Sequence, residues 1–171
     1  REELLRDPLY QGARHARLRG AEQRRLVDAF VEALARRFPR AVLQWEDLAK
    51  DTALDVLDAH RKTIASFNDD VQGTGAVALE GLLAACASKG ERITDQRIVI
   101  HGAGAGGAGV ARAIRAGLER EGLTEAQARA RVLVLDSGGL LVEGARMEPY
   151  KEALAQRREA LEGWRFAGER P

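Results

Sequence analysis

Cysteine is almost absent from this sequence, which carries one, Cys86, among 171 residues. A single cysteine cannot form a disulfide within the chain, and it lies in the small, apolar stretch 81–87, where a buried thiol fits. A reducing, cytoplasmic environment is therefore expected. Histidines do not have the spacing of a zinc site, because His15 and His60 stand alone and His101, which ends a predicted strand, is expected to face the core.

The sequence also lacks an excess of charge and a long apolar run. Lysine and arginine total 27 against 26 aspartate and glutamate residues, so nucleic acid and an anionic membrane surface are not expected as partners. Apolar stretches are interrupted by charge or glycine within a few residues and no signal peptide is recognised, so no membrane span is expected. A hydrophobic content of 45% is typical of a globular chain with a sizeable core.

Hydrophobic periodicity predicts alternating helices and strands. The four-residue spacing of Leu26, Phe30 and Leu34 indicates an amphipathic helix, and Phe38 continues this apolar stripe. A charged, helix-like tail is expected from Tyr150 onward. Helices are predicted over 21–37, 51–61, 107–121 and 124–128, with a further long helix running to about residue 89, and strands over 41–44, 63–67, 97–100 and 132–135.

Two acidic doublets follow two of these strands. Glu46 and Asp47 come after the first strand, and Asp69 and Asp70 come after the second. An isolated doublet is most often a solvated loop or a helix cap, but carboxylates at the ends of consecutive strands can converge. Converging carboxylates raise one another's proton affinity unless a cation lies between them, so this grouping favours Mg²⁺ or Mn²⁺.

A glycine-rich turn follows the third strand and opens the next helix. In a dinucleotide-binding turn, glycines spaced as Gly102, Gly104 and Gly107 permit the tight turn, the approach of phosphate to the backbone, and close packing of helix on strand. Asp136 ends the following strand, where a carboxylate can accept hydrogen bonds from ribose hydroxyls. Helix starts rich in small residues also occur in purely structural units, so that alternative stays open.

Taken together, these motifs resemble malic enzyme, the metal-dependent oxidative decarboxylase of malate. The resemblance spans nearly the whole sequence, and its most specific part is the string from Phe67 to Thr74. The segments that carry it are Asp7-Pro8-Leu9-Tyr10-Gln11-Gly12, Gln44-Trp45-Glu46-Asp47, Phe67-Asn68-Asp69-Asp70-Val71-Gln72-Gly73-Thr74, Gly102-Ala103-Gly104 and Asp136-Ser137.

The resemblance implies a role for each candidate residue. Asp69 would lie beside the catalytic base and tune it, and Lys151 matches a position where lysine accompanies a preference for the 2′-phosphate of NADP. The implied cofactors are NADP or NAD together with Mg²⁺ or Mn²⁺. The implied metal ligands are Glu46, Asp47 and Asp70, and the implied coenzyme site contains Gly102, Gly104, Gly107, Asp136, Ser137 and Lys151.

The implied fold is α/β, with part of a metal- and substrate-binding domain over residues 1–68 and an incomplete Rossmann-like dinucleotide-binding domain over 69–171. In the family, the tyrosine that acts as general acid and the lysine that acts as general base come earlier than the region where Arg1 begins. Further substrate and nicotinamide contacts come later than Pro171. The resemblance therefore implies an internal portion of the enzyme.

The implied activity of the parent enzyme is oxidative decarboxylation of malate to pyruvate and CO₂, carried out by a homo-oligomer whose partners are these small molecules. The chain alone is expected to be inactive. A non-catalytic nucleotide-binding or interaction module derived from a malic enzyme is the alternative. Another dinucleotide-dependent dehydrogenase would explain the glycine turn but gives no reason for the paired acids.

Overall fold

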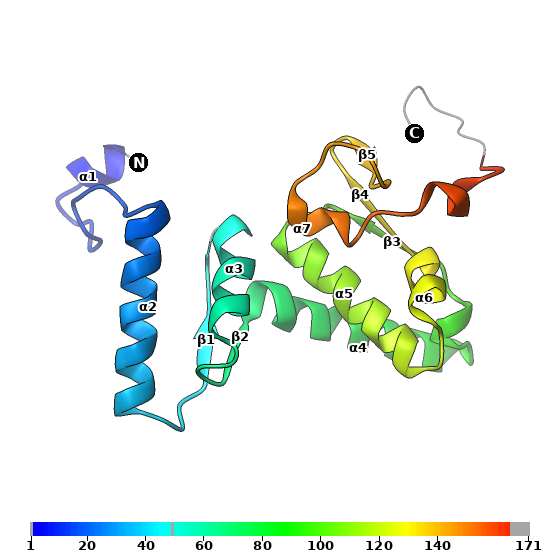
Figure 1. The fold of residues 1–171 in the computed structure, drawn as a ribbon, viewed down its shortest axis with the longest axis horizontal. Coiled ribbons are helices and arrows are strands. Elements are labelled where there is room, and N and C mark those ends of the chain that lie inside the picture. Colours follow the sequence, from blue (N-terminus) through cyan, green and yellow to red (C-terminus); the bar gives the residue numbers. More distant parts are fainter. Residues whose placement is uncertain (1, 49, 165–171) are drawn as a thin grey trace. The chain divides into compact units, whose positions relative to one another are not determined.

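The computed structural model describes residues 2–48 and 50–164 and divides the chain into two compact units, Arg1–Ala41 and Val42–Pro171. The first unit contains two helices, α1 (Glu2–Arg6) and α2 (Gly20–Arg37) (Figure 1). The second unit contains all the described strands and the remaining helices.

Helix α2 has the predicted bounds to within one residue, but its apolar stripe does not face inward. Leu26, Phe30 and Phe38 are each at least half exposed, and Val31 is the buried residue of the helix. An amphipathic helix buries its stripe only against another element, and within the described part of its own unit α2 is accompanied only by the short α1. The predicted amphipathic helix is present, and its stripe is largely exposed in the described structure.

The second unit begins with a parallel pair of strands joined by a helix. β1 (Leu43–Trp45) pairs with β2 (Ser66–Asn68), with Trp45 opposite Asn68, and α3 (Lys50–His60) connects the two strands. Leu54 and Leu57 of α3 are buried, as predicted. Because both strands run in the same direction, the residues that follow them emerge at the same edge of the pair.

A five-residue π-helical turn, η1 (Asp69–Gly73), follows β2 and leads directly into α4 (Thr74–Lys89). Asn68 Oδ1 accepts the Val71 N–H at 2.8 Å, and the Asn68 N–H donates to Gln72 Oε1 at 3.0 Å. These reciprocal bonds resemble a capping box. The sequence pattern predicted a strand followed by a helix here but not the π-helical turn, a rare feature that is frequent at functional sites.

The rest of the second unit is built on a three-stranded sheet. β3 (Ile98–His101) pairs in parallel with β4 (Val132–Asp136), which pairs antiparallel with β5 (Gly139–Leu140). Helices α5 (Ala105–Arg120) and α6 (Glu125–Arg131) connect β3 to β4, and the 3₁₀ turn η2 (Ile93–Asp95) precedes β3. The core includes the buried side chains of Ala108, Ala111, Ile114 and Leu118 from α5 and of Val132 and Val134 from β4.

The charged, helix-like tail predicted from Tyr150 onward is not one continuous helix in its described part, residues 150–164, and its remaining residues, 165–171, lie outside the described part of the chain. The segment after β5 contains α7 (Pro149–Glu152) and the 3₁₀ turn η3 (Arg158–Leu161), separated by buried, non-helical residues. Arg115 of α5 donates to the carbonyl oxygens of Ala153 at 2.7 Å and Leu154 at 2.8 Å. Gln156 Nε2 donates at 2.7 and 2.8 Å to carbonyls at the end of α6 and the start of β4. These bonds fasten the segment against α5, α6 and β4, so helical propensity does not decide its form.

Small residues bring η1 and α4 against α5 at backbone distance. A Cβ added at Gly109 of α5 would overlap the carbonyl oxygen of Val71, and one added at Gly75 of α4 would lie 2.7 Å from the carbonyl oxygen of Gly109. Real Cβ atoms do not approach so closely, and repacking around an added methyl is costly. The absence of a side chain at Gly75 and Gly109 therefore lets the turn that carries Asp69 and Asp70 pack closely against α5.

One described segment is long and apolar enough to cross a membrane, judged by length and composition alone. It is Asp69–Lys89, 21 residues that include a window of mean hydropathy 1.2. The expectation that no such run exists is therefore wrong by this measure. The segment consists of η1 and α4, and it packs against α5 through Gly75 and Val71.

Two glycine substitutions test this packing. Gly109→Ala is expected to lower the free energy of unfolding by about 1–3 kcal/mol, because the new methyl collides with backbone. Gly81→Ala, at an exposed helical site with open space, is expected to raise it by roughly 0.5–1 kcal/mol through helix propensity. Thermal unfolding followed by circular dichroism measures both, and equal melting temperatures for the two variants would contradict the close approach.

Candidate functional site

Four carboxylates gather where β1 and β2 end. Partial desolvation raises the pKa of Glu46 above its ordinary 4.5, and the charges of Asp70 and Asp69, a side-chain hydrogen bond with Asp69, and the charge of Asp47 raise it further. Carboxylates perturb one another in this way only at short range, because water screens distant surface charges. The parallel register of β1 and β2 thus brings together the two doublets that lie 23 positions apart in the sequence.

Asp47 has an unusual backbone conformation. Its φ of 52° places it in the left-handed region, and among the described residues other than glycine it alone has a positive φ. Aspartate tolerates this region better than most residues, but the conformation is still costly and is concentrated at functional sites. It turns the chain sharply just after β1, within the acidic cluster.

Asp69 is held by the geometry of η1. Its carbonyl oxygen accepts a hydrogen bond from Thr74 Oγ1 at 3.4 Å, and a Cβ at Gly73 would overlap the Asp69 side-chain oxygen Oδ1. Gly73 therefore leaves room for the carboxylate to turn back over the π-helical turn. The role of Asp69 in tuning a catalytic base stays a prediction.

The donor chemistry of the cluster fits a hard divalent cation, because all four side chains offer carboxylate oxygens. Within residues 2–48 and 50–164, however, no group of three or more His, Cys, Asp or Glu side chains stands close enough together to hold a metal ion. The structure therefore brings Glu46, Asp47 and Asp70 into one neighbourhood without assembling them into a coordination sphere. Their assignment as ligands stays a prediction.

The glycine turn between β3 and α5 has the geometry that its spacing predicted. Gly102 has a φ of 117°, which favours glycine, and a Cβ at Gly107 would overlap the Gly102 carbonyl oxygen. At Gly104, the N-cap of α5, a Cβ would have no neighbour within 4 Å, so the backbone is open on that side. An open backbone at a helix N-terminus is where a phosphate binds.

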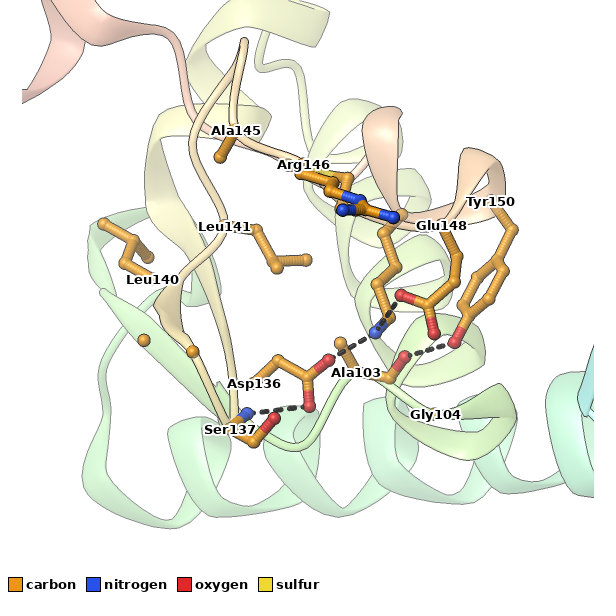
Figure 2. Close-up of a pocket in the computed structure, with 14 residues that line it drawn as sticks. Ala103, Gly104, Asp136, Ser137, Leu140, Leu141, Ala145, Arg146, Glu148 and Tyr150 are labelled. Carbon is orange, nitrogen blue, oxygen red and sulfur yellow. Dashed lines mark hydrogen bonds and ion pairs between the residues drawn. The ribbon is translucent and has the colours of Figure 1, made fainter.

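A cavity of about 460 Å³ lies beside this turn (Figure 2). It is bounded by the turn, the segment after β4, and α7 with the loop that precedes it. Of the predicted coenzyme residues, Gly104, Asp136, Ser137 and Lys151 line it, whereas Gly102 and Gly107 shape the turn behind it.

Lys151 is the central charged group of the cavity. It is 5% exposed, and its Nζ pairs with Asp136 Oδ2 and, at 2.7 Å, with Glu148 Oε2. The hydrogen bonds to Asp136 and Glu148 raise the pKa of Lys151. The Lys151 ammonium and the backbone N–H of Ser137, which donates to Asp136 Oδ1 at 2.8 Å, lower the pKa of Asp136.

Sequence reasoning missed Glu148 and Tyr150 and misplaced His101. Glu148 stands three residues before Lys151, a spacing at which helical side chains can pair, and this was the available signal. Tyr150 Oη donates to the carbonyl oxygen of Ala103 at 2.9 Å and so fastens α7 to the glycine turn. His101 is exposed at the end of β3, not directed to the core as expected.

Two family models match most of this chain. Residues 1–61 match the family model described as the malic enzyme N-terminal domain, and residues 71–170 match the one described as the malic enzyme NAD binding domain. The predicted boundary after residue 68 lies between these matches and stays a prediction.

Individual relatives agree with the family models. The NAD-dependent malic enzyme of Pseudomonas aeruginosa is 44% identical over 95% of this chain, and that of Idiomarina loihiensis is 40% identical over 99%. The crystal structure of malic enzyme from Pyrococcus horikoshii is similar to this chain, with a TM-score of 0.64 and 28% sequence identity. The matched region covers 83% of this chain and 33% of the Pyrococcus chain.

The chain spans 29% of the length of the Pseudomonas relative and 30% of the Idiomarina relative. The family models cover Glu46, Asp47 and the glycine turn, whereas Asp69 and Asp70 lie in the gap between the two matches. The chain belongs to the malic enzyme family.

Proposed function

We propose that this chain supplies the metal-binding carboxylates and the adenosine half of the coenzyme site of an enzyme that converts malate to pyruvate and CO₂ with NAD. The observation that carries the proposal is the contact between η1 and α5, which holds the acidic cluster against the helix opened by the glycine turn. Hydride transfer requires substrate and coenzyme side by side, and this contact supplies that proximity.

In this proposal, Glu46, Asp47 and Asp70 hold a divalent cation. When bound, Mg²⁺ or Mn²⁺ polarises a substrate oxygen and offsets negative charge that develops on it. The three carboxylates supply the hard oxygen donors and bind the cation only when ionised. Asp69, whose charge also raises the pKa of Glu46, lies beside them without being a ligand.

The coenzyme is proposed to be NAD, because both bacterial relatives are NAD-dependent malic enzymes. Its pyrophosphate would lie on the open backbone at Gly104, and its adenosine ribose would donate to Asp136. Asp136 is already oriented for this by Ser137 and Lys151. The lone, buried Cys86 supports a cytoplasmic location.

A neutralising substitution tests the acidic cluster. Glu46→Gln removes a like charge, so it is expected to raise the melting temperature of the metal-free chain at pH 7 and to weaken Mn²⁺ binding. Glu80→Gln, on the exposed surface of α4, is the matched control and should change neither quantity. Calorimetric titration with Mn²⁺ and thermal unfolding provide the measurements. Tighter Mn²⁺ binding by Glu46→Gln would exclude Glu46 as a ligand.

The raised pKa of Glu46 also predicts the direction of a pH effect. The folded state binds this proton more tightly than the unfolded chain does, so this group's contribution to stability is present below pH 4.5 and is lost as pH rises through the raised pKa. Mn²⁺ requires the ionised form, so its affinity should increase over the same interval, which lies above pH 4.5. Mn²⁺ affinity that stays flat or decreases as pH rises above 4.5 would contradict this assignment.

The glycine turn is tested by Gly104→Ala. The added methyl meets no protein atom within 4 Å, so the melting temperature should not change. It would occupy the space of the pyrophosphate and should weaken NAD binding by roughly tenfold or more, about 1.4 kcal/mol. Unchanged NAD affinity in a titration of the 171-residue chain would place the phosphates elsewhere.

Turnover by this chain alone is a further test. The chain spans only 29% and 30% of the length of its two bacterial relatives, so we expect no malate-dependent NADH formation with Mn²⁺. Absorbance at the NADH band measures this directly. Sustained malate-dependent reduction by the purified chain would show that the described residues already hold a complete catalytic set.

A further inference from the structure

The cavity beside the glycine turn contains a buried cation shared by two anions. Lys151 Nζ contacts Asp136 Oδ2 and Glu148 Oε2, and all three residues line the cavity. Figure 2 shows the carboxylates of Asp136 and Glu148 reaching into the cavity from opposite elements, the end of β4 and the start of α7. Two carboxylates against one ammonium leave this group of three with a net charge of −1.

The charge of this group matters at the adenosine ribose, where NAD carries a hydroxyl and NADP a phosphate. The carboxylate at the end of the second strand accepts from the ribose hydroxyls of NAD, and a 2′-phosphate in NADP needs a nearby cation instead. Here the closest candidate, Lys151, is buried and already paired with Asp136 and Glu148. A 2′-phosphate would therefore meet a lysine whose charge is already shared by two carboxylates.

We propose that Glu148 is a coenzyme-specificity residue, which pairs with Lys151 and so withholds the lysine's charge from a 2′-phosphate. The proposal rests on the proposed function, since it assumes that the adenosine ribose binds at Asp136. It explains how a lysine at this position is compatible with NAD. The expectation of NADP preference from Lys151 considered the lysine alone, without its second anionic partner.

Arg146 is the second cation that lines the cavity. Its side chain is exposed and extends from the loop before α7 (Figure 2). An exposed guanidinium is screened by salt and water, whereas the Lys151 ammonium is buried and its partners Asp136 and Glu148 are 31% and 42% exposed. Lys151 and its two partners therefore dominate the charge at the ribose, and Arg146 contributes less.

Binding of NAD and NADP to the 171-residue chain, measured by calorimetry at low ionic strength, tests the proposal. The unaltered chain should bind NAD more tightly than NADP. Glu148→Gln removes one negative charge next to Lys151 and should shift the NAD to NADP affinity ratio toward NADP by roughly tenfold. Glu152→Gln, on the same helix and exposed, is the matched control and should leave the ratio unchanged.

The same Glu148→Gln substitution in a Lys151→Gln variant tests whether its effect on coenzyme preference acts through the lysine. In Lys151→Gln, Glu148→Gln should no longer shift the ratio, because its effect acts through the lysine. Circular dichroism melting of each variant confirms that it is folded. Arg146→Gln should change the ratio less than Glu148→Gln does.

The outcomes distinguish the two levels of inference. A tenfold shift confined to Glu148→Gln supports the role of Glu148. Binding of both coenzymes with a ratio that Glu148→Gln does not change, or tighter binding of NADP by the unaltered chain, overturns that role and leaves the coenzyme site standing. Binding of neither coenzyme by the folded chain overturns the coenzyme site and the specificity role together.

Discussion

The close approach of η1 to α5 is the constraint on which the rest of the site depends. A Cβ at Gly109 would lie 2.0 Å from the carbonyl oxygen of Val71, and a Cβ at Gly75 of α4 would lie 2.7 Å from the carbonyl oxygen of Gly109. Asp70 precedes Val71 directly, so the position of the acidic cluster relative to the coenzyme helix follows from this contact. A larger residue would push apart the two halves of the proposed chemistry, even though neither glycine touches substrate or coenzyme in the proposal.

Electrostatic crowding is the second organising feature, and the chain uses it in two ways. At the ends of β1 and β2, desolvation together with the charges of Asp70, Asp69 and Asp47 raises the pKa of Glu46, and this crowding of like charges favours an external cation. In the cavity, Lys151 stands between Asp136 and Glu148, so the compensation is internal. The first arrangement suits binding a divalent metal, and the second suits rejecting an additional phosphate.

The described fold also shows how a short sequence string encodes several structural tasks. Asn68 caps η1, Gln72 returns the bond, and Gly73 leaves space for the Asp69 carboxylate. Only the carboxylates of that string were assigned chemistry from the sequence. The other residues orient those carboxylates, since a π-helical turn bound at both ends has little freedom to reposition them.

The sequence by itself determined the local features: most helices and strands, the glycine turn, the doublets after β1 and β2, and the family. These follow from periodicity and from residue spacing, which act over a few positions. Tertiary structure alone decided the exposure of Phe30 on α2, the non-helical segment held by Arg115, and the pairing of Lys151 with Asp136 across 15 positions. Each of these depends on which distant surface or partner is present, and periodicity along the chain carries no information about that.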